Sequence, residues 1–392
     1  MRLNLLALAS LFVVACSTEP TPTNADADTG RSDVADETGH DAAEVSSDVP
    51  TAVFDGSLAG PWTATVSFES LSYGERTIPV AVWGPSDASR GAVSISELIP
   101  NRADEYTALS ELSSNGCATT ELPVSPNRDL APGAWPLVVY SHCHKCLGIS
   151  GASVAAALAS WGHVVIVPDH TGNTLWDGID GTNVELGGEF LEVRGADVVT
   201  ILDRALSAEA PFEALSEALD SSQVGLVGHS FGAVTVGWVA ERDARVRAVA
   251  ALAAPVENPL IPGVTAANIE TPILFLVAVE DNSITEFGNV LMRQNFEGVA
   301  GPAVKLEVAD AGHWSVSDMC GLTESFMPGC GEANRQTNGE SFTYLPAEEG
   351  RALTSAWVTG FLGDELGSVS GAGAWMSDQS DERVSVETGG AE

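Results

Sequence analysis

The chain has 392 residues, of which 44% are hydrophobic and 9 are tryptophans. This is enough apolar material to fill the core of one large globular domain or two average ones. The formal net charge is −37 at pH 7. Because like charges repel, this acidic balance argues against nucleic acid and anionic lipid surfaces as partners, and it favours solubility.

The N-terminus is typical of an export signal. Arg2 gives a basic start, an apolar run extends from Leu5 to Val14, and small Ala15 precedes Cys16. The run is too short to span a bilayer as a mature helix. The stretch VVAC resembles the lipobox of bacterial lipoproteins, which implies that residues 1–15 are removed and that Cys16 is acylated. A secretory signal with a chance cysteine is the alternative, and both interpretations predict export.

Two further segments contain few large apolar side chains. Residues 16–52 consist mainly of Ser, Thr, Pro, Asp, Glu and Ala, and residues 367–392 are similar. Burial in such segments cannot offset chain entropy, so we predict an acidic disordered tether and a disordered tail. The expected protein is a monomeric lipoprotein of the bacterial cell envelope, at the outer membrane or cell surface. Its N-terminal lipid is its only expected membrane contact.

Residues 53–366 alternate between short β-branched runs and segments of helical length. Near-continuous apolar strands separated by amphipathic helices predict an α/β fold with a mostly parallel central sheet, covered by helices on both faces. The first two strands should form an antiparallel pair. The expected strands are TATVSFES, TIPVAVWGP, WPLVVYSH, HVVIVPDH, SQVGLVGH, VRAVAAL, TPILFLVAV and PAVKLEVAD, and the expected helices are 152–161, 190–207, 231–242, 284–295 and 347–362.

A serine stands between one of these strands and the helix after it. Ser230 occupies the centre of GHSFG, and Gly228 and Gly232 leave room for the tight turn that exposes a nucleophile. The helix that follows offers free N–H groups and a partial positive charge to an oxyanion. We predict that Ser230 is a nucleophile rather than a helix cap, which is the structural alternative.

A serine nucleophile needs a base and an orienting acid. His313 follows the last predicted strand, and it is the histidine that fits the chain order serine, acid, histidine. Glu280 and Asp281 follow the strand TPILFLVAV, and neighbouring side chains at a strand end point in opposite directions. We choose Asp281 as the acid, with Glu280 as the alternative.

Five stretches of the chain together resemble a known family. PLVVYSHCHKCLG, WGHVVIVPDHTGNT, GHSFG, ILFLVAVEDNS and AGHWSVSDMC are similar to bacterial predicted dienelactone hydrolases and plasma-type platelet-activating-factor acetylhydrolases, which are α/β-hydrolase serine esterases. The resemblance implies the α/β-hydrolase fold, the catalytic residues Ser230, Asp281 and His313, and an oxyanion hole formed by the backbone N–H groups of Phe231 and His144. Relatives have glycine where this chain has Cys143. The cysteine side chain restricts the backbone conformations of the loop that carries His144.

Several other residues are expected near this site. His170 and Trp176 follow the fourth strand, and Trp314 adjoins His313, so we expect all three to border the substrate pocket. For the two tryptophans, packing in the core is the alternative. Arg194 and Asp197 are expected to form a structural pair on one helix face.

Five cysteines follow Cys16, and export makes pairing the expected state, although an odd number cannot all pair within the chain. Cys320 and Cys330 close a short loop, so we predict a disulfide between them. Cys117 is expected to pair with Cys143 or Cys146. The stretch HCHKC also has the spacing of zinc ligands, but a second ligand pair is missing, so we predict no metal.

The hypothesis is a serine ester hydrolase that forms an acyl-enzyme and needs no cofactor. Its expected substrates are short-chain carboxylic esters or short-acyl and oxidised phospholipids. One alternative, suggested by the altered loop at Cys143, is a catalytically inactive surface lipoprotein that uses the same fold for binding. The other is a polyester or lactone hydrolase with the same triad.

Overall fold

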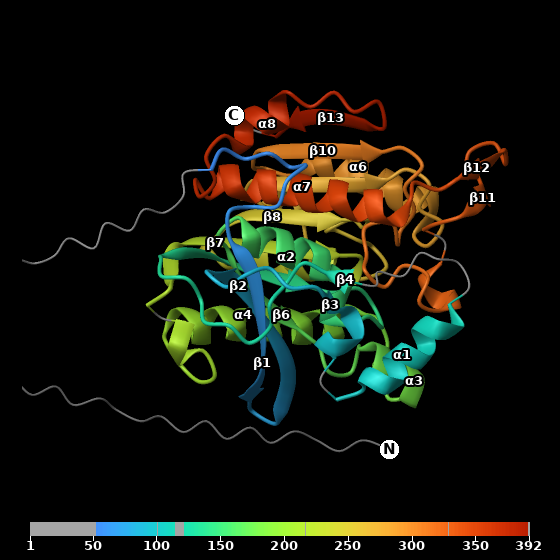
Figure 1. The fold of residues 1–392 in the computed structure, drawn as a ribbon. Coiled ribbons are helices and arrows are strands. Elements are labelled where there is room, and N and C mark those ends of the chain that lie inside the picture. The colour runs from blue at the N-terminus through green and yellow to red at the C-terminus, as the bar shows by residue number, and fades with distance from the viewer. Residues whose placement is uncertain (1–51, 100, 114–120, 216, 328, 391–392) are drawn as a thin grey trace, which may run out of the picture. The chain divides into compact units, whose positions relative to one another are not determined.

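The computed structural model describes residues 52–390 except 100, 114–120, 216 and 328 (Figure 1). The predicted signal peptide, the predicted acylation site Cys16 and almost all of the predicted tether lie outside the described residues. Within residues 52–390, apart from those gaps, no helix combines the length and apolar character needed to cross a bilayer.

A nine-stranded sheet forms the centre of the fold. Six adjacent strands run parallel, and an antiparallel strand pair and an antiparallel final strand flank them. The predicted mostly parallel sheet is therefore confirmed. In spatial order the strands are β1 (Thr63–Tyr73), β2 (Arg76–Ser86), β6 (Val164–Pro168), β5 (Trp135–Ser141), β7 (Leu219–His229), β8 (Val246–Leu252), β9 (Ile273–Ala278), β10 (Ala303–Val308) and β13 (Val384–Gly389).

The helices cover both faces of this sheet. They are α1 (Ala103–Leu112), α2 (Ala152–Ser160), α3 (Leu175–Asp180), α4 (Gly188–Leu206), α5 (Phe231–Ala240), α6 (Thr285–Gly298), α7 (Ala347–Glu365) and α8 (Ala372–Ser377). Short 3-10 turns occur at Ile95–Leu98, Gly148–Gly151, Glu213–Leu215, Ala266–Asn268 and Glu324–Phe326. Two small antiparallel pairs complete the fold, β3 (Val93–Ser94) with β4 (Glu121–Leu122) and β11 (Glu332–Asn334) with β12 (Ser341–Thr343).

Two hydrophobic clusters lie on opposite faces of the sheet because side chains alternate along each strand. Val138 of β5 packs in the cluster that includes α2 and α7. Its neighbours Leu137 and Val139 pack in the cluster that includes α4, α5 and α6. Figure 1 shows α7 in front of the sheet and α6 behind it. Burial on both faces explains why the central strands read as continuous apolar runs.

The C-terminal tail corrects one prediction, because residues 367–390 are folded. β13 pairs antiparallel with β10, and Lys305 forms an ion pair with Glu387 across them at 2.6 Å. In α8, Trp375 packs edge-on against Phe54 and Trp357, with ring centroids 5.1 and 5.3 Å apart. The tail is ordered because it covers the open edge of β10 and partly buries its tryptophan.

Candidate active site

Ser230 lies on a sharp turn between β7 and α5. Its backbone has φ 57° and ψ −121°, a strained conformation for a residue with a side chain. The turn is fixed on both sides, because the Ser230 N–H donates to the carbonyl of Leu252 at 2.9 Å and its carbonyl accepts from Ala233 at 2.8 Å. A side chain at Gly228 or Gly232 would collide with backbone atoms. The sequence GHSFG therefore permits a turn that presents the serine hydroxyl at the end of the sheet.

Three residues far apart in the sequence meet at this turn. His313 Nε2 lies 2.9 Å from Ser230 Oγ, and His313 Nδ1 lies 2.6 Å from Asp281 Oδ2. Because the carboxylate accepts from Nδ1–H, Nε2 is left to accept the hydroxyl proton of Ser230. Asp281 and His313 are buried, which strengthens their electrostatic interaction. The predicted serine, histidine and aspartate are thus placed in the order that nucleophilic catalysis requires.

Asp281 and its neighbour Glu280 point in different directions. The second oxygen of Asp281, Oδ1, accepts the N–H groups of Ser283 at 2.9 Å and Ile284 at 3.0 Å. Glu280 instead pairs with Arg335 at 2.9 Å, on the other side of the strand end. The geometry therefore places Asp281, and not Glu280, against the histidine.

Aromatic rings surround the histidine. Trp314 packs edge-on against His313, with ring centroids 4.8 Å apart, and against Phe326 at 4.9 Å. Trp314 is 6% exposed and belongs to the core, which agrees with the core-packing alternative; its predicted contact with the substrate pocket stays a prediction. His229 Nε2 donates to the carbonyl of His313 at 3.0 Å, and burial lowers the pKa of His229. A neutral His229 therefore helps to hold the loop that carries the base.

The loop after β5 contains the predicted oxyanion donor His144. The N–H groups of Lys145 and Cys146 donate to the carbonyls of Asn173 and Cys143 at 3.0 and 3.3 Å. Among the described residues, neither the backbone N–H of His144 nor that of Phe231, at the start of α5, donates a hydrogen bond. Both predicted oxyanion donors are thus without a protein acceptor and available to a ligand.

Asn173, which follows β6, holds the side chain of His144. The amide Nδ2 of Asn173 donates to His144 Nδ1 at 2.6 Å. Burial lowers the pKa of His144 to about 4, so its ring is neutral at pH 7. The position of Asn173 after the fourth strand predicts that it borders the pocket, but its amide contact to His144 was not predicted.

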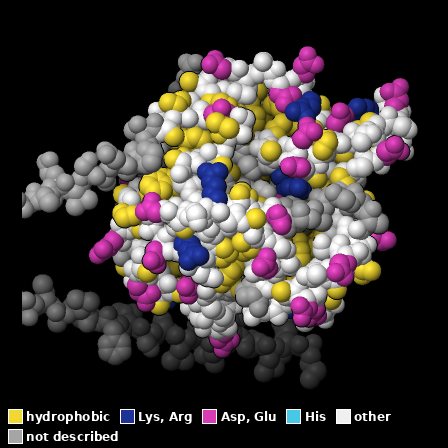
Figure 2. Space-filling view, in the orientation of Figure 1, with side chains coloured by type: hydrophobic (Ala, Val, Ile, Leu, Met, Phe, Trp, Pro, Cys, Tyr) yellow, Lys and Arg dark blue, Asp and Glu magenta, His cyan; other side chains and the backbone are white. Residues whose placement is uncertain are grey.

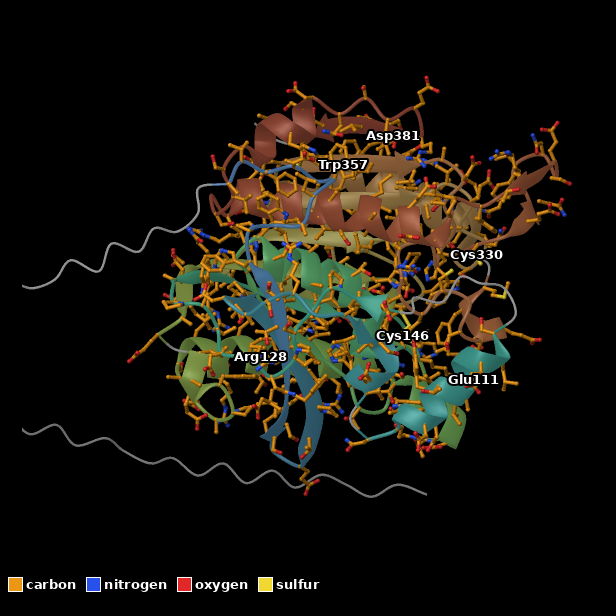
Figure 3. The ribbon with its side chains drawn as sticks, in the orientation of Figure 1. Glu111, Arg128, Cys146, Cys330, Trp357 and Asp381 are labelled. Carbon is orange, nitrogen blue, oxygen red and sulfur yellow. A yellow bond between two sulfur atoms is a disulfide. The ribbon has the colours of Figure 1, made fainter. Side chains whose placement is uncertain are left out.

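The cysteines pair differently from the prediction. Cys143 and Cys146 form a disulfide in the loop after β5, so the expected pairing of either with Cys117, which lies outside the described residues, is wrong. Figure 3 labels Cys146 and Cys330. Cys320 is a buried free thiol, whereas Cys330 is disulfide-bonded, so the predicted bridge between these two is also wrong. Cys143 and Cys146 can pair because the tight turn at residues 144 and 145 brings their Cα atoms to 5.2 Å.

His170 is not a pocket residue, contrary to the prediction. Its side chain is fully buried, and its Nδ1 donates to Asp197 at 2.8 Å while its Nε2 accepts from Ser141 Oγ at 3.0 Å. Burial lowers the pKa of His170 to about 4. Asp197 also pairs with Arg76 at 2.5 Å and does not hydrogen-bond to Arg194, so the expected pair on α4 is absent. His170 thus connects Ser141, at the end of β5, to Asp197 on α4.

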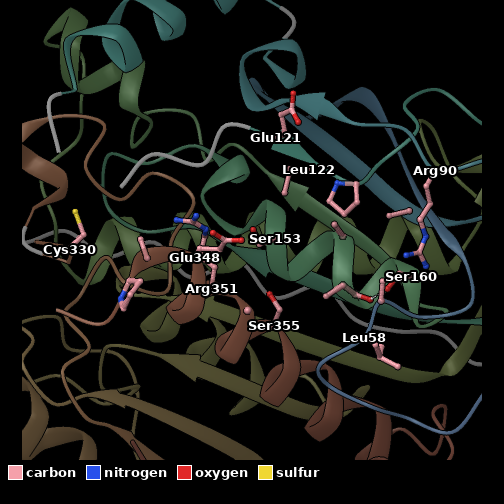
Figure 4. A pocket seen from close by; sticks show the side chains of 18 of the residues that line it. Leu58, Arg90, Glu121, Leu122, Ser153, Ser160, Cys330, Glu348, Arg351 and Ser355 are labelled. Atoms are coloured by element: carbon pink, nitrogen blue, oxygen red, sulfur yellow. Dashed lines mark hydrogen bonds between the residues drawn. The ribbon is translucent and has the colours of Figure 1, made fainter. Parts of the chain in front are cut away.

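Two cavities lie away from the triad. A cavity of about 500 Å³ is lined by Trp176, with Arg102 stacked 4.2 Å above the ring. A larger cavity of about 920 Å³ lies between α2 and α7, where Ser153, Arg351 and Ser355 project into it (Figure 4). Neither is lined by a triad residue. Trp176 therefore borders a cavity that reaches Leu147 and Gly148 but not Ser230, and its predicted place in the substrate pocket stays a prediction.

The exposed surface carries the acidic excess of the chain. On the face shown in Figure 2, acidic side chains are spread over the rim and separated by few lysines and arginines. Large apolar side chains are also exposed, among them Leu186, Leu260 and Phe287. On this face the acidic charge is thus distributed over the surface rather than collected at one site.

Comparisons with known proteins agree with this architecture. Residues 130–313 match the model of the Dienelactone hydrolase family, a span that includes all three triad residues. A ferulic acid esterase from Streptomyces cinnamoneus has a similar structure, with a TM-score of 0.59 and 20% sequence identity over 83% of this chain and 96% of the esterase chain. No curated protein matches the chain. The chain has an α/β-hydrolase fold, and the matches support a hydrolase.

Proposed function

We propose that this protein is a serine ester hydrolase that works through an acyl-enzyme. The observation that carries the proposal is the chain of contacts from Asp281 to His313 and from His313 to Ser230, at 2.6 and 2.9 Å. Supporting it are the match to the Dienelactone hydrolase family and the fold shared with a ferulic acid esterase.

The proposed reaction follows from the positions of the protons. Ser230 Oγ attacks the ester carbonyl carbon while His313 Nε2 accepts the hydroxyl proton, and Asp281 stabilises the resulting imidazolium. The N–H groups of Phe231 and His144 bind the oxyanion of the tetrahedral intermediate. His313 then donates its proton to the departing alkoxide, which leaves an acyl group on Ser230. Water, deprotonated by His313, attacks this acyl group and releases the carboxylic acid.

The proposed substrates are short-chain carboxylic esters or short-acyl and oxidised phospholipids. The reaction needs neither a metal nor an organic cofactor. Polyester or lactone hydrolysis by the same residues is the alternative substrate class. We also propose that the protein is a monomeric, exported lipoprotein whose anchor is Cys16; palmitate labelling of cells that express the wild type, compared with Cys16→Ser, tests the anchor.

Hydrolysis of p-nitrophenyl acetate and butyrate tests the proposed activity. We expect the wild type to be active, and Ser230→Ala to lose at least about 10⁴-fold in kcat because the nucleophile is removed. Ser222→Ala is a matched control, since Ser222 lies on the same strand and is exposed. A fluorophosphonate probe should label the wild type and the control but not Ser230→Ala. Full activity in Ser230→Ala would refute the nucleophile, and an unlabelled, inactive wild type would favour the binding-protein alternative.

A further inference from the structure

A buried arginine lies beneath the oxyanion loop. Arg194, on α4, is 0% exposed, and burial lowers the pKa of its guanidinium to about 9, so it is charged at pH 7. Taking a cation out of water is costly unless hydrogen bonds compensate the charge. The hydrogen-bond acceptors of Arg194 therefore indicate which part of the structure this buried cation stabilises.

These acceptors belong to the segments that carry the oxyanion donor His144. Nη2 donates to Ser141 Oγ at 2.9 Å, at the end of β5, and also to the backbone carbonyl of His142. Nη1 donates to Asn173 Oδ1 at 2.8 Å, and the amide of Asn173 in turn holds His144. One guanidinium thus fixes the start of the loop directly and the donor residue through one intermediate.

The same guanidinium contacts the other proposed donor. Its central carbon lies 4.6 Å from the ring centroid of Phe231, a cation–π contact to the residue that follows the nucleophile. Residues 142–144 and residue 231 come from different strand ends, so their N–H groups converge only if β5 and α5 keep a fixed separation. Arg194 contacts both segments and can set that separation.

The acceptors of Arg194 are neutral, and a chain of hydrogen bonds connects its guanidinium to the carboxylate of Asp197. Ser141 Oγ accepts a hydrogen bond from Arg194 Nη2 and donates one to His170 Nε2, and His170 Nδ1 donates to Asp197. Burial alone would raise the pKa of Asp197, but hydrogen bonds from Arg76 and His170 lower it to about 2, so this acid stays ionised. An arginine needed only for an ion pair would contact the carboxylate itself. This one directs its donors to the loop.

We propose that Arg194 is a positioning residue that holds the two oxyanion donors, Phe231 and His144, at their working separation. The inference rests on the proposed esterase function. Its effect should fall on the transition state, because the oxyanion exists there and not in the bound ester.

The test compares two changes at this position with a control on the same helix. Arg194→Lys keeps the charge but cannot reach all three acceptors, and Arg194→Met also removes the charge. We expect kcat to fall about 10- to 100-fold in the first and about 100- to 1,000-fold in the second, with KM within about threefold of the wild type. Arg204→Lys, at a surface ion pair with Glu209, should leave both constants unchanged.

A second readout separates positioning from a merely structural role. A trifluoromethyl ketone forms a hemiketal oxyanion on the nucleophilic serine, whereas the corresponding methyl ketone binds mainly as a ground-state analogue. The Ki of the trifluoromethyl ketone should rise in parallel with the loss of kcat, and the Ki of the methyl ketone should not change. A purely structural arginine would lower the folded fraction and the melting temperature without this difference between the inhibitors.

The outcomes are distinguishable. If the wild type is inactive on p-nitrophenyl esters, the proposed function fails. If the wild type is active and the folded Arg194→Lys variant has the same kcat and the same inhibitor Ki values as the wild type, only the role of Arg194 is overturned. Should both changes prevent folding, Ser141→Ala removes one acceptor and leaves the arginine in place; it should lower kcat about fivefold at unchanged KM, as expected for one lost hydrogen bond. An unchanged kcat in Ser141→Ala would then overturn the proposal.

Discussion

Replacing Asp281 by asparagine isolates the role of the buried acid. The amide side chain would keep an oxygen for the N–H groups of Ser283 and Ile284, so the start of α6 should remain intact. Its NH₂ group would then face His313 Nδ1, which lies 2.6 Å from the present carboxylate oxygen. A donor at that position forces the proton of the imidazole onto Nε2, and Nε2 can then no longer accept the proton of Ser230.

The loss of the correct tautomer and of the negative charge should lower kcat about 10⁴-fold, which corresponds to about 5 kcal/mol of transition-state stabilisation. Initial rates of p-nitrophenyl butyrate hydrolysis measure this, and circular dichroism checks the fold. The matched control is Glu280→Gln at the neighbouring position. It breaks the pair with the partly exposed Arg335 but does not touch His313, so kcat should stay within about threefold. Near-normal turnover in Asp281→Asn, or a larger loss in Glu280→Gln, would refute the assignment of the acid.

Two further predictions concern the disulfide and the buried histidines. Replacing both Cys143 and Cys146 by serine should lower kcat about tenfold, because the loop that carries the proposed oxyanion donor His144 loses its cross-link. Rates of ester hydrolysis by this variant, and by the wild type with and without reductant, measure the effect. Unchanged rates in the variant and in the reduced wild type would contradict a role of the disulfide in holding the loop. Burial lowers the pKa of His163 to about 4, so between pH 6.5 and pH 4 the unfolded chain binds a proton that the folded protein does not. Over that range the folded state should therefore lose about 3 kcal/mol of stability through this residue. In His163→Asn, which can still donate to the carbonyl of Leu158, the free energy of unfolding measured in urea should fall less steeply as the pH is lowered. An unchanged pH dependence of this free energy would show that the histidine is not buried as a neutral ring.

The central sheet and the geometry of the triad could be predicted because each depends on a local signal. Strand β7 reads as an apolar run that ends in glycine, and this pattern shows where a buried parallel strand stops and a tight turn begins. Chain order then selected His313. Side-chain alternation at the strand end predicted only that one of Glu280 and Asp281 would face the histidine, and the choice of Asp281 rested on its position counted from Pro272. The structure places both residues beyond the end of β9, where Asp281 contacts His313 and Glu280 contacts Arg335.

The tail could not be predicted in the same way, because its order depends on a distant partner. The strand VSVETG is short and mostly exposed, and it forms only because the edge of β10 offers unpaired backbone groups. Composition alone favoured disorder. A local signal was nevertheless present in Trp375, since a tryptophan in a segment of small residues needs apolar surroundings, which Phe54 and Trp357 supply.

Side-chain direction limited the prediction of the site's surroundings. The sequence placed His170 at a strand end, where a pocket residue and a supporting residue look alike. Its partner Asp197 is 27 positions away on α4, and no local pattern joins the two. Cysteine spacing was equally ambiguous, because a separation of three residues suits a metal site as well as a disulfide in a turn.

The altered oxyanion loop was the main reason to doubt catalysis, and the backbone of the loop removes that reason. Lys145, and not Cys143, carries the positive φ of the turn, at 55°. The missing glycine at Cys143 therefore costs no backbone strain at that position, and a cost of about 1–3 kcal/mol falls on Lys145 instead. That strain is offset by the disulfide around the turn and by the hydrogen bond from the Lys145 N–H to Asn173. Because the N–H of His144 needs no flexible glycine to stay free, the chain can replace a glycine-rich loop by a cross-linked one and still keep the proposed oxyanion hole.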